Sequence, residues 1–239
     1  MKHSLIIFPF VLVTVSILFL NYTNVSVYGV PSSDYSGFKI NEIISGLTEP
    51  TSMVFIDQNN ILVLEKSGNV RIVSNEVLQN TPVLTVDAVN KNERGLLGIT
   101  TNEEYVFLYF TTELQKNGED ELRNVIYRYQ FDGTKLVEPV LIVDFPATPG
   151  TNHQGGKIFI GKDGNLYSVT GEMQRNGQLQ NIKSGPGPDS SGIIIRVDPT
   201  TGNAIQDNPF INKNPDVEGL DKYYAYGIRN SFGLTYDPV

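Results

Sequence analysis

Hydrophobic residues after Phe38 fall into short runs that are separated by polar turn residues. No long segment repeats them at the 3.6-residue period of a helix. The clearest runs are Ser52–Ile56, Ile61–Glu65 and Val70–Val73, which are divided by two turns rich in Asn, Asp and Gly. Three strands joined by tight turns within about 30 residues are typical of the meander in one blade of a β-propeller.

The same alternation of strands and turns recurs further along the chain. The later runs that we interpret as strands are Val83–Val89, Gly95–Thr101, Tyr105–Thr111, Asn124–Gln130, Pro139–Asp144, Gly192–Val197, Tyr223–Gly227 and Gly233–Tyr236. The polar segment Glu113–Leu122 is predicted to be a solvated hairpin loop. The repetition favours an all-β fold, a β-propeller of four-stranded meander blades, over the alternative of a β-sandwich. At roughly 45–55 residues per blade, residues 36–239 would hold about four blades.

One predicted hairpin carries polar residues that suggest chemistry. Its strands are Ile158–Ile160 and Leu166–Val169, and the Asp-Gly pair between them tolerates the positive φ angles of a tight turn. His153 precedes the first strand and Glu172 follows the second. Because a hairpin returns the chain on itself, both side chains can reach the same edge of the sheet. We therefore expect an active-site edge there.

Composition and charge exclude several classes of partner and of active site. The chain has 239 residues, a formal net charge of −8, no cysteine and only two histidines, His3 and His153. An acidic chain without a basic stripe argues against a nucleic-acid partner. The absence of cysteine excludes thiolate chemistry, a zinc ribbon and a disulfide framework. Any metal should be one that prefers oxygen ligands, such as calcium.

The first residues differ in kind from the rest. Lys2 and His3 precede an apolar run from Leu5 to Leu20, which is typical of the charged and hydrophobic regions of an export signal. Residues 1–29 are therefore expected to be a signal peptide or an uncleaved N-terminal anchor. Such an anchor is the only membrane contact that we expect. The remainder is expected to work outside the cytoplasm, either secreted or anchored at the cell surface.

Several motifs, in order along the chain, resemble one known family. They are Gly46–Pro50 with Ile61–Arg71, Glu93–Gly98, His153–Lys157 with Asp163–Leu166 and Gly171-Glu172, Gly192–Asp198 with Asp207–Phe210, and Tyr226–Leu234. Together they are similar to the soluble quinoprotein glucose dehydrogenases and the related aldose sugar dehydrogenases, also called glucose/sorbosone dehydrogenases. The resemblance covers nearly all of the chain that follows the expected signal.

The resemblance implies a six-bladed propeller, of which this chain is the N-terminal part with an incomplete ring. It also implies that aldose sugars are oxidised at the anomeric carbon to lactones. The cofactors would be pyrroloquinoline quinone and calcium, with calcium ligands outside this chain, and an external electron acceptor would be the further partner. Whether the 239-residue chain binds the quinone or is active by itself stays open at this point, as do the sugar and the oligomeric state.

The resemblance also assigns roles to individual residues. His153 matches the catalytic base, with Glu172 as the carboxylate beside it, and Arg229 and Asn230 match a pair next to the quinone and the substrate. Glu93 falls where a polar side chain faces the cofactor. The chemistry is consistent, because a neutral imidazole with a pKa of about 6.5 suits proton abstraction at neutral pH. An arginine can stabilise negative charge that develops on quinone oxygens.

Two other functions fit the same pattern. A calcium-dependent sugar lactonase would hydrolyse lactones without a quinone and would need a calcium site ringed by carboxylates. A non-catalytic extracellular propeller would bind a glycan or a protein without using His153. Structural roles are the alternative for the individual residues, since Arg229 and Asn230 could bridge blades and Glu172 could cap a turn. The segment Met173–Ser191 is the expected specificity loop.

Overall fold

The computed structural model describes residue 34, residues 37–217 and residues 219–237. The chain divides into two units, Met1–Glu42 and Ile43–Val239. Where the first unit is described, it contains neither strand nor helix. The expected signal or anchor, residues 1–29, lies outside the described residues. Within them, no helix has the length and hydrophobicity needed to cross a membrane.

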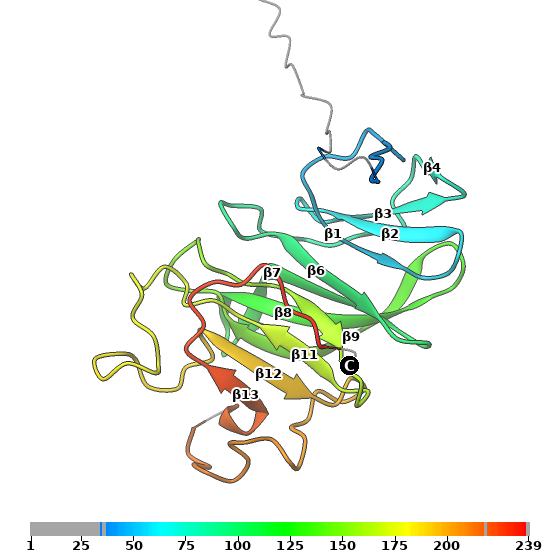
Figure 1. The fold of residues 1–239 in the computed structure, drawn as a ribbon. Helices are drawn as coiled ribbons and strands as arrows, with labels where there is room; N and C mark the ends of the chain where they lie inside the picture. The colour runs from blue at the N-terminus through cyan, green and yellow to red at the C-terminus, as the bar shows by residue number, and fades with distance from the viewer. Residues whose placement is uncertain (1–33, 35–36, 218, 238–239) are drawn as a thin grey trace, which may run out of the picture. The chain divides into compact units, whose positions relative to one another are not determined.

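The second unit contains three antiparallel sheets in its described residues, and each sheet uses consecutive strands (Figure 1). The first comprises β1 (Pro50–Phe55), β2 (Asn60–Glu65), β3 (Asn69–Ser74) and β4 (Val77–Leu78), with β5 (Leu84–Thr85) paired to β3. The second comprises β6 (Leu96–Thr101), β7 (Val106–Lys116), β8 (Glu119–Phe131) and β9 (Leu136–Pro146). The third comprises β10 (Ile158–Ile160), β11 (Leu166–Val169), β12 (Ile193–Val197) and β13 (Tyr223–Tyr226), with a short 3-10 helix at Leu220–Lys222.

These sheets are the predicted propeller blades, so the all-β propeller fold is confirmed. The count of about four blades was too high for the described residues, which form three sheets. Gly233–Tyr236, expected to begin a further blade, forms no strand. An apolar run at the end of a chain segment becomes a strand only where a neighbouring strand accepts its hydrogen bonds, and no described strand pairs with this one.

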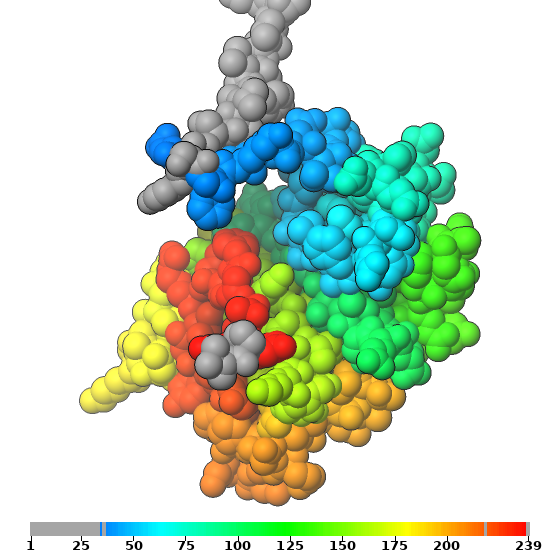
Figure 2. Space-filling view, turned by 45° about the vertical axis from the view of Figure 1, so that its right-hand side comes forward, coloured from blue at the N-terminus to red at the C-terminus, as the bar shows by residue number. Residues whose placement is uncertain are grey.

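The blades stack face to face, and both faces of the middle blade are buried. Along β7, Leu108 and Phe110 join one hydrophobic cluster with the first sheet, whereas Phe107 and Tyr109 join a second cluster with the third sheet. Side chains alternate between the faces of a strand, which explains why this strand is hydrophobic throughout. Figure 2 shows the corresponding order on the surface, from cyan through green to orange.

The expectation of a solvated loop at Glu113–Leu122 was wrong. β7 continues to Lys116, β8 begins at Glu119, and these two residues pair in the ladder. Only Asn117 and Gly118 form the turn, with φ angles of 54° and 85°. Asn-Gly favours this two-residue turn because both positions tolerate positive φ. The polar residues on both sides of this turn show that the ends of β7 and β8 are exposed to solvent, and they do not mark where the strands end.

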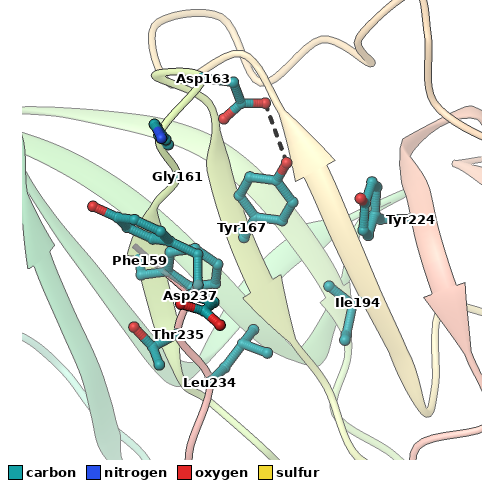
Figure 3. A pocket seen from close by; sticks show the side chains of 11 residues that line it. Phe159, Gly161, Asp163, Tyr167, Ile194, Tyr224, Leu234, Thr235 and Asp237 are labelled. Atoms are coloured by element: carbon teal, nitrogen blue, oxygen red, sulfur yellow. Dashed lines mark hydrogen bonds between the residues drawn. The ribbon is translucent and has the colours of Figure 1, made fainter. Parts of the chain in front are cut away.

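A carboxylate stabilises the turn of the predicted hairpin between β10 and β11. Asp163 accepts hydrogen bonds from the Asn165 side chain at 2.7 Å, from the Tyr167 hydroxyl at 3.1 Å and from the Arg196 guanidinium at 2.7 Å. Asp163 and Tyr167 are among the residues that line a cavity of about 390 Å³, and Figure 3 shows the hydrogen bond between them. Burial alone would raise the pKa of Asp163, but these hydrogen bonds outweigh it and lower the pKa to about 2.

We predict that Asp163→Asn lowers stability at neutral pH and flattens its acid dependence. Because the folded-state pKa is lowered, the carboxylate stabilises the fold above about pH 4, and this contribution is lost as the pH falls towards about 2. Thermal unfolding, followed by circular dichroism between about pH 4 and pH 2, should therefore show that the melting temperature of the variant falls less steeply with pH than that of the wild type. Asp87→Asn, at an exposed position, is the control. Parallel declines of wild type and Asp163→Asn would contradict the prediction.

Candidate active site

His153 lies in the segment that leads from β9 into β10, and its main chain is held in an unusual conformation. Its φ angle is 60°, in the left-handed region that few non-glycine residues adopt. Its N–H donates to Oε2 of Glu93 at 2.7 Å, and its carbonyl accepts the N–H of Met173 at 3.2 Å. Sparsely populated backbone conformations persist where surrounding contacts determine them, and they are frequent at functional sites.

Glu172 follows β11 and contacts the imidazole of His153 directly. Its Oε1 forms a short hydrogen bond with Nδ1 of the ring. The Glu172 side chain is 1% exposed, and that of His153 is 16% exposed. A carboxylate on Nδ1 favours the tautomer that carries its proton there, so Nε2 becomes the acceptor. The predicted pair therefore forms, and it presents one basic nitrogen.

The second oxygen of this carboxylate has no hydrogen-bond partner among the residues that the structure describes. Oε2 of Glu172 is buried and makes no hydrogen bond within the described chain. Solvent screens a buried carboxylate only weakly, and this strengthens its attraction for a protonated imidazole. The arrangement is thus suited to stabilising positive charge on His153 after proton transfer.

Glu93 and Asn230 come together beside His153. Oε2 of Glu93 accepts the side-chain amide of Asn230 at 3.0 Å in addition to the N–H of His153. Oδ1 of Asn230 accepts the N–H of Gly155 at 3.4 Å. One carboxylate therefore joins the segment before β6, the segment before β10 and the segment after β13. This contact also assigns Glu93 a positioning role that the sequence did not indicate.

Arg229 reaches the site through its main chain. Its carbonyl accepts the N–H of Glu172 at 2.8 Å. A Cβ added to Gly171 would lie 2.1 Å from the carbonyl oxygen of His153 and 3.0 Å from that of Arg229, so the three segments converge. The Arg229 side chain is exposed and makes no ion pair or hydrogen bond in the described part of the chain. Its guanidinium is therefore available to a ligand.

A buried polar network that sequence reasoning missed supports this segment. Gln154 is fully buried, donates to the Gly150 carbonyl at 2.8 Å and accepts the Asn124 amide at 2.9 Å. The Tyr109 hydroxyl donates to the Gln154 carbonyl at 3.1 Å, and burial raises its pKa, so it remains a donor. The sequence offered little signal for this network, since Asn124 directly follows the charged first half of β8, where a polar residue is expected to be exposed.

A cavity of about 250 Å³ adjoins Glu93. Its lining residues are Thr51, Ser52, Lys66, Asn92, Glu93, Leu97, Gly155, Lys157 and Phe232. Most of them come from or next to the first strand of each of the three sheets, whereas Lys66 follows β2 and Phe232 follows β13. Among the described residues, no group of three or more acidic, histidine or cysteine side chains is arranged to hold a metal ion.

Comparisons with known proteins show the family and the fold of this chain. A family model described as Glucose / Sorbosone dehydrogenase matches residues 47–239. Quinoprotein glucose dehydrogenase B of Acinetobacter calcoaceticus is 27% identical over 226 residues, which cover 82% of this chain and 45% of that protein. The chain spans about half the length of the curated relatives it matches.

Two solved structures are similar in fold and sequence. One, described as a glucose dehydrogenase from Thermus thermophilus, has a TM-score of 0.69 and 29% identity, with coverage of 83% of this chain and 57% of its own. The other is the PQQ-bound form of aldose sugar dehydrogenase from Streptomyces coelicolor, with a TM-score of 0.61 and 27% identity. It covers 80% of this chain and 54% of its own.

We predict that Gly171→Ala destabilises the protein, because the added methyl group cannot fit between the two carbonyls. Overpacking at such a site should lower the free energy of unfolding by about 1–3 kcal/mol. Denaturant unfolding followed by fluorescence would measure this. Gly187→Ala is the matched control, since a Cβ there meets nothing within 4 Å. Equal stability of the two variants would show that the main-chain segments are not packed as described.

Proposed function

This chain belongs to the glucose/sorbosone dehydrogenase family, and we propose that it serves the quinone-dependent oxidation of an aldose sugar at the anomeric carbon to a lactone. The observation that carries the proposal is the contact of Glu172 with Nδ1 of His153, which leaves Nε2 as a base. The hydrogen bonds of Glu93 with the His153 main chain and with Asn230 support the proposal, because they hold further polar groups next to the segment that carries the base.

The reaction removes a proton from the sugar hydroxyl and a hydride from the carbon that bears it. Nε2 of His153 takes the proton, and Glu172 stabilises the resulting imidazolium. Pyrroloquinoline quinone, when bound, supplies the hydride acceptor, because no amino-acid side chain accepts a hydride. The exposed guanidinium of Arg229 would stabilise negative charge on a ligand bound next to it.

The residues present fit a quinone cofactor in two respects. The cavity beside Glu93 has polar and cationic side chains, and Arg229 has no other partner among the described residues. Glu93 and Asn230, which hold each other, would border the cofactor, and His153 would face it. Calcium is proposed by resemblance alone, and no step is assigned to it. The sugar, an external electron acceptor and a location outside the cytoplasm complete the proposal.

We predict that the purified chain, given pyrroloquinoline quinone and calcium, reduces an artificial electron acceptor when an aldose is added. Removing the base in His153→Ala should lower this rate at least about 100-fold. Glu172→Gln should lower kcat to a smaller extent, since Nε2 is retained. Lys162→Ala, at the exposed turn of the same hairpin, is the control and should retain the wild-type rate.

Other outcomes of this experiment would contradict the proposal. Lactone hydrolysis that needs calcium but no quinone would identify a lactonase. Binding of a glycan or protein that is unchanged in His153→Ala, without turnover of any aldose, would identify a binding propeller. Wild-type rates of dye reduction in His153→Ala would show that His153 is not the base.

A further inference from the structure

The cavity beside Glu93 is lined by two lysines that form no ion pair with any described acidic residue. Lys66 and Lys157 both line it. Neither forms an ion pair with a carboxylate in the described part of the chain, in contrast to Lys116, whose ammonium lies 2.6 Å from Asp144. The chain as a whole carries a net charge of −8, so two unpaired ammonium groups in one cavity reverse the local sign.

The carboxylate in this cavity is already engaged. Oε2 of Glu93 accepts the N–H of His153 and the amide of Asn230, both of which are neutral donors. These bonds hold the carboxylate towards the His153 segment. Two lysines and one carboxylate give the cavity a net positive charge. A concave surface with partly buried charges attracts an anion more strongly than a flat, solvent-exposed surface does.

Close main-chain packing fixes both lysines. The N–H of Lys66 donates to the Glu49 carbonyl at 3.0 Å, and its own carbonyl accepts the N–H of Leu96 at 2.9 Å. A Cβ on Gly95 would lie 2.6 Å from Cγ of Lys66, so the lysine stem packs against a position that only glycine allows. The main chain and the first carbons of this side chain are therefore held in place by the protein itself.

Lys157 is held in a comparable way. Its carbonyl accepts the N–H of Val169 at 3.1 Å. Gly156 precedes it with a φ angle of 103°, and a Cβ there would lie 2.7 Å from Cβ of Leu97, another lining residue. The two lysines that line this cavity therefore come from anchored segments of the first and third blades.

We propose that Lys66 and Lys157 form a binding site for a carboxylate group of an anionic ligand. Ammonium–carboxylate hydrogen bonds are among the strong ones, and the cavity of about 250 Å³ holds a small organic acid or one end of a larger one. Glu93 lines the same cavity and accepts the N–H of His153, which connects the proposed carboxylate site with the segment that carries the base. If the ligand is the carboxylated quinone, this inference rests on the proposed function. If the ligand is a free organic acid, the inference stands independently of that function.

The test measures binding to the full 239-residue chain by isothermal titration calorimetry. The probes are pyrroloquinoline quinone and citrate, and glucose is the uncharged control. Lys66→Gln and Lys157→Gln should each weaken binding of both carboxylated probes by about tenfold, and the double variant by more. Raising the salt concentration should weaken binding to the wild type and change it little in the double variant. Lys162→Gln controls for loss of a surface charge, and circular dichroism confirms folding.

The outcomes separate this site from the proposed function. Citrate binding that the double variant loses, without any binding of the quinone, would support the carboxylate site and contradict the quinone-dependent reaction. Quinone binding of wild-type strength in the folded double variant would overturn the site and leave the reaction standing. Failure of the wild type to bind either probe would overturn both. Lys66→Arg with Lys157→Arg should retain binding, since the positive charges remain.

Discussion

The close approach of three main-chain segments at Gly171 is the constraint on which the site depends. The carbonyls of His153 and Arg229 both lie near the position that a Cβ of Gly171 would take. Only with that spacing do the N–H of Glu172 and the carbonyl of Arg229 meet at 2.8 Å. The packing of the main chain thus determines the positions of the Glu172 and His153 side chains, and with them the contact between the two.

The blades contribute to the site through their polar interior as well as through their hydrophobic faces. Gln154, Asn124 and Tyr109 are buried between the second and third sheets, and each has a hydrogen-bond partner. A satisfied buried network gives a segment one definite conformation, whereas an unsatisfied one would destabilise it. This explains how His153 keeps a left-handed conformation next to a fully buried neighbour.

Much of the fold could be predicted because its signals are local. The strands β2, β3, β6, β10, β11 and β12 lie within a residue or two of the predicted runs. The hairpin of β7 and β8 was missed in part, since polar residues near an exposed turn resemble a loop. Of the candidate site, His153 and Glu172 share one hairpin, which made their proximity predictable. Their proposed roles are supported by this geometry and stay proposals.

The sequence by itself determined the strands, the turns, the motifs of the family and the one histidine that follows the expected signal. Only the tertiary structure decided that Glu93 holds His153 and Asn230, and that Lys66 and Lys157 line one cavity. The reason is physical. Strand and turn preferences act between neighbours in the chain, whereas these contacts join residues on different blades, and their positions depend on how the sheets stack.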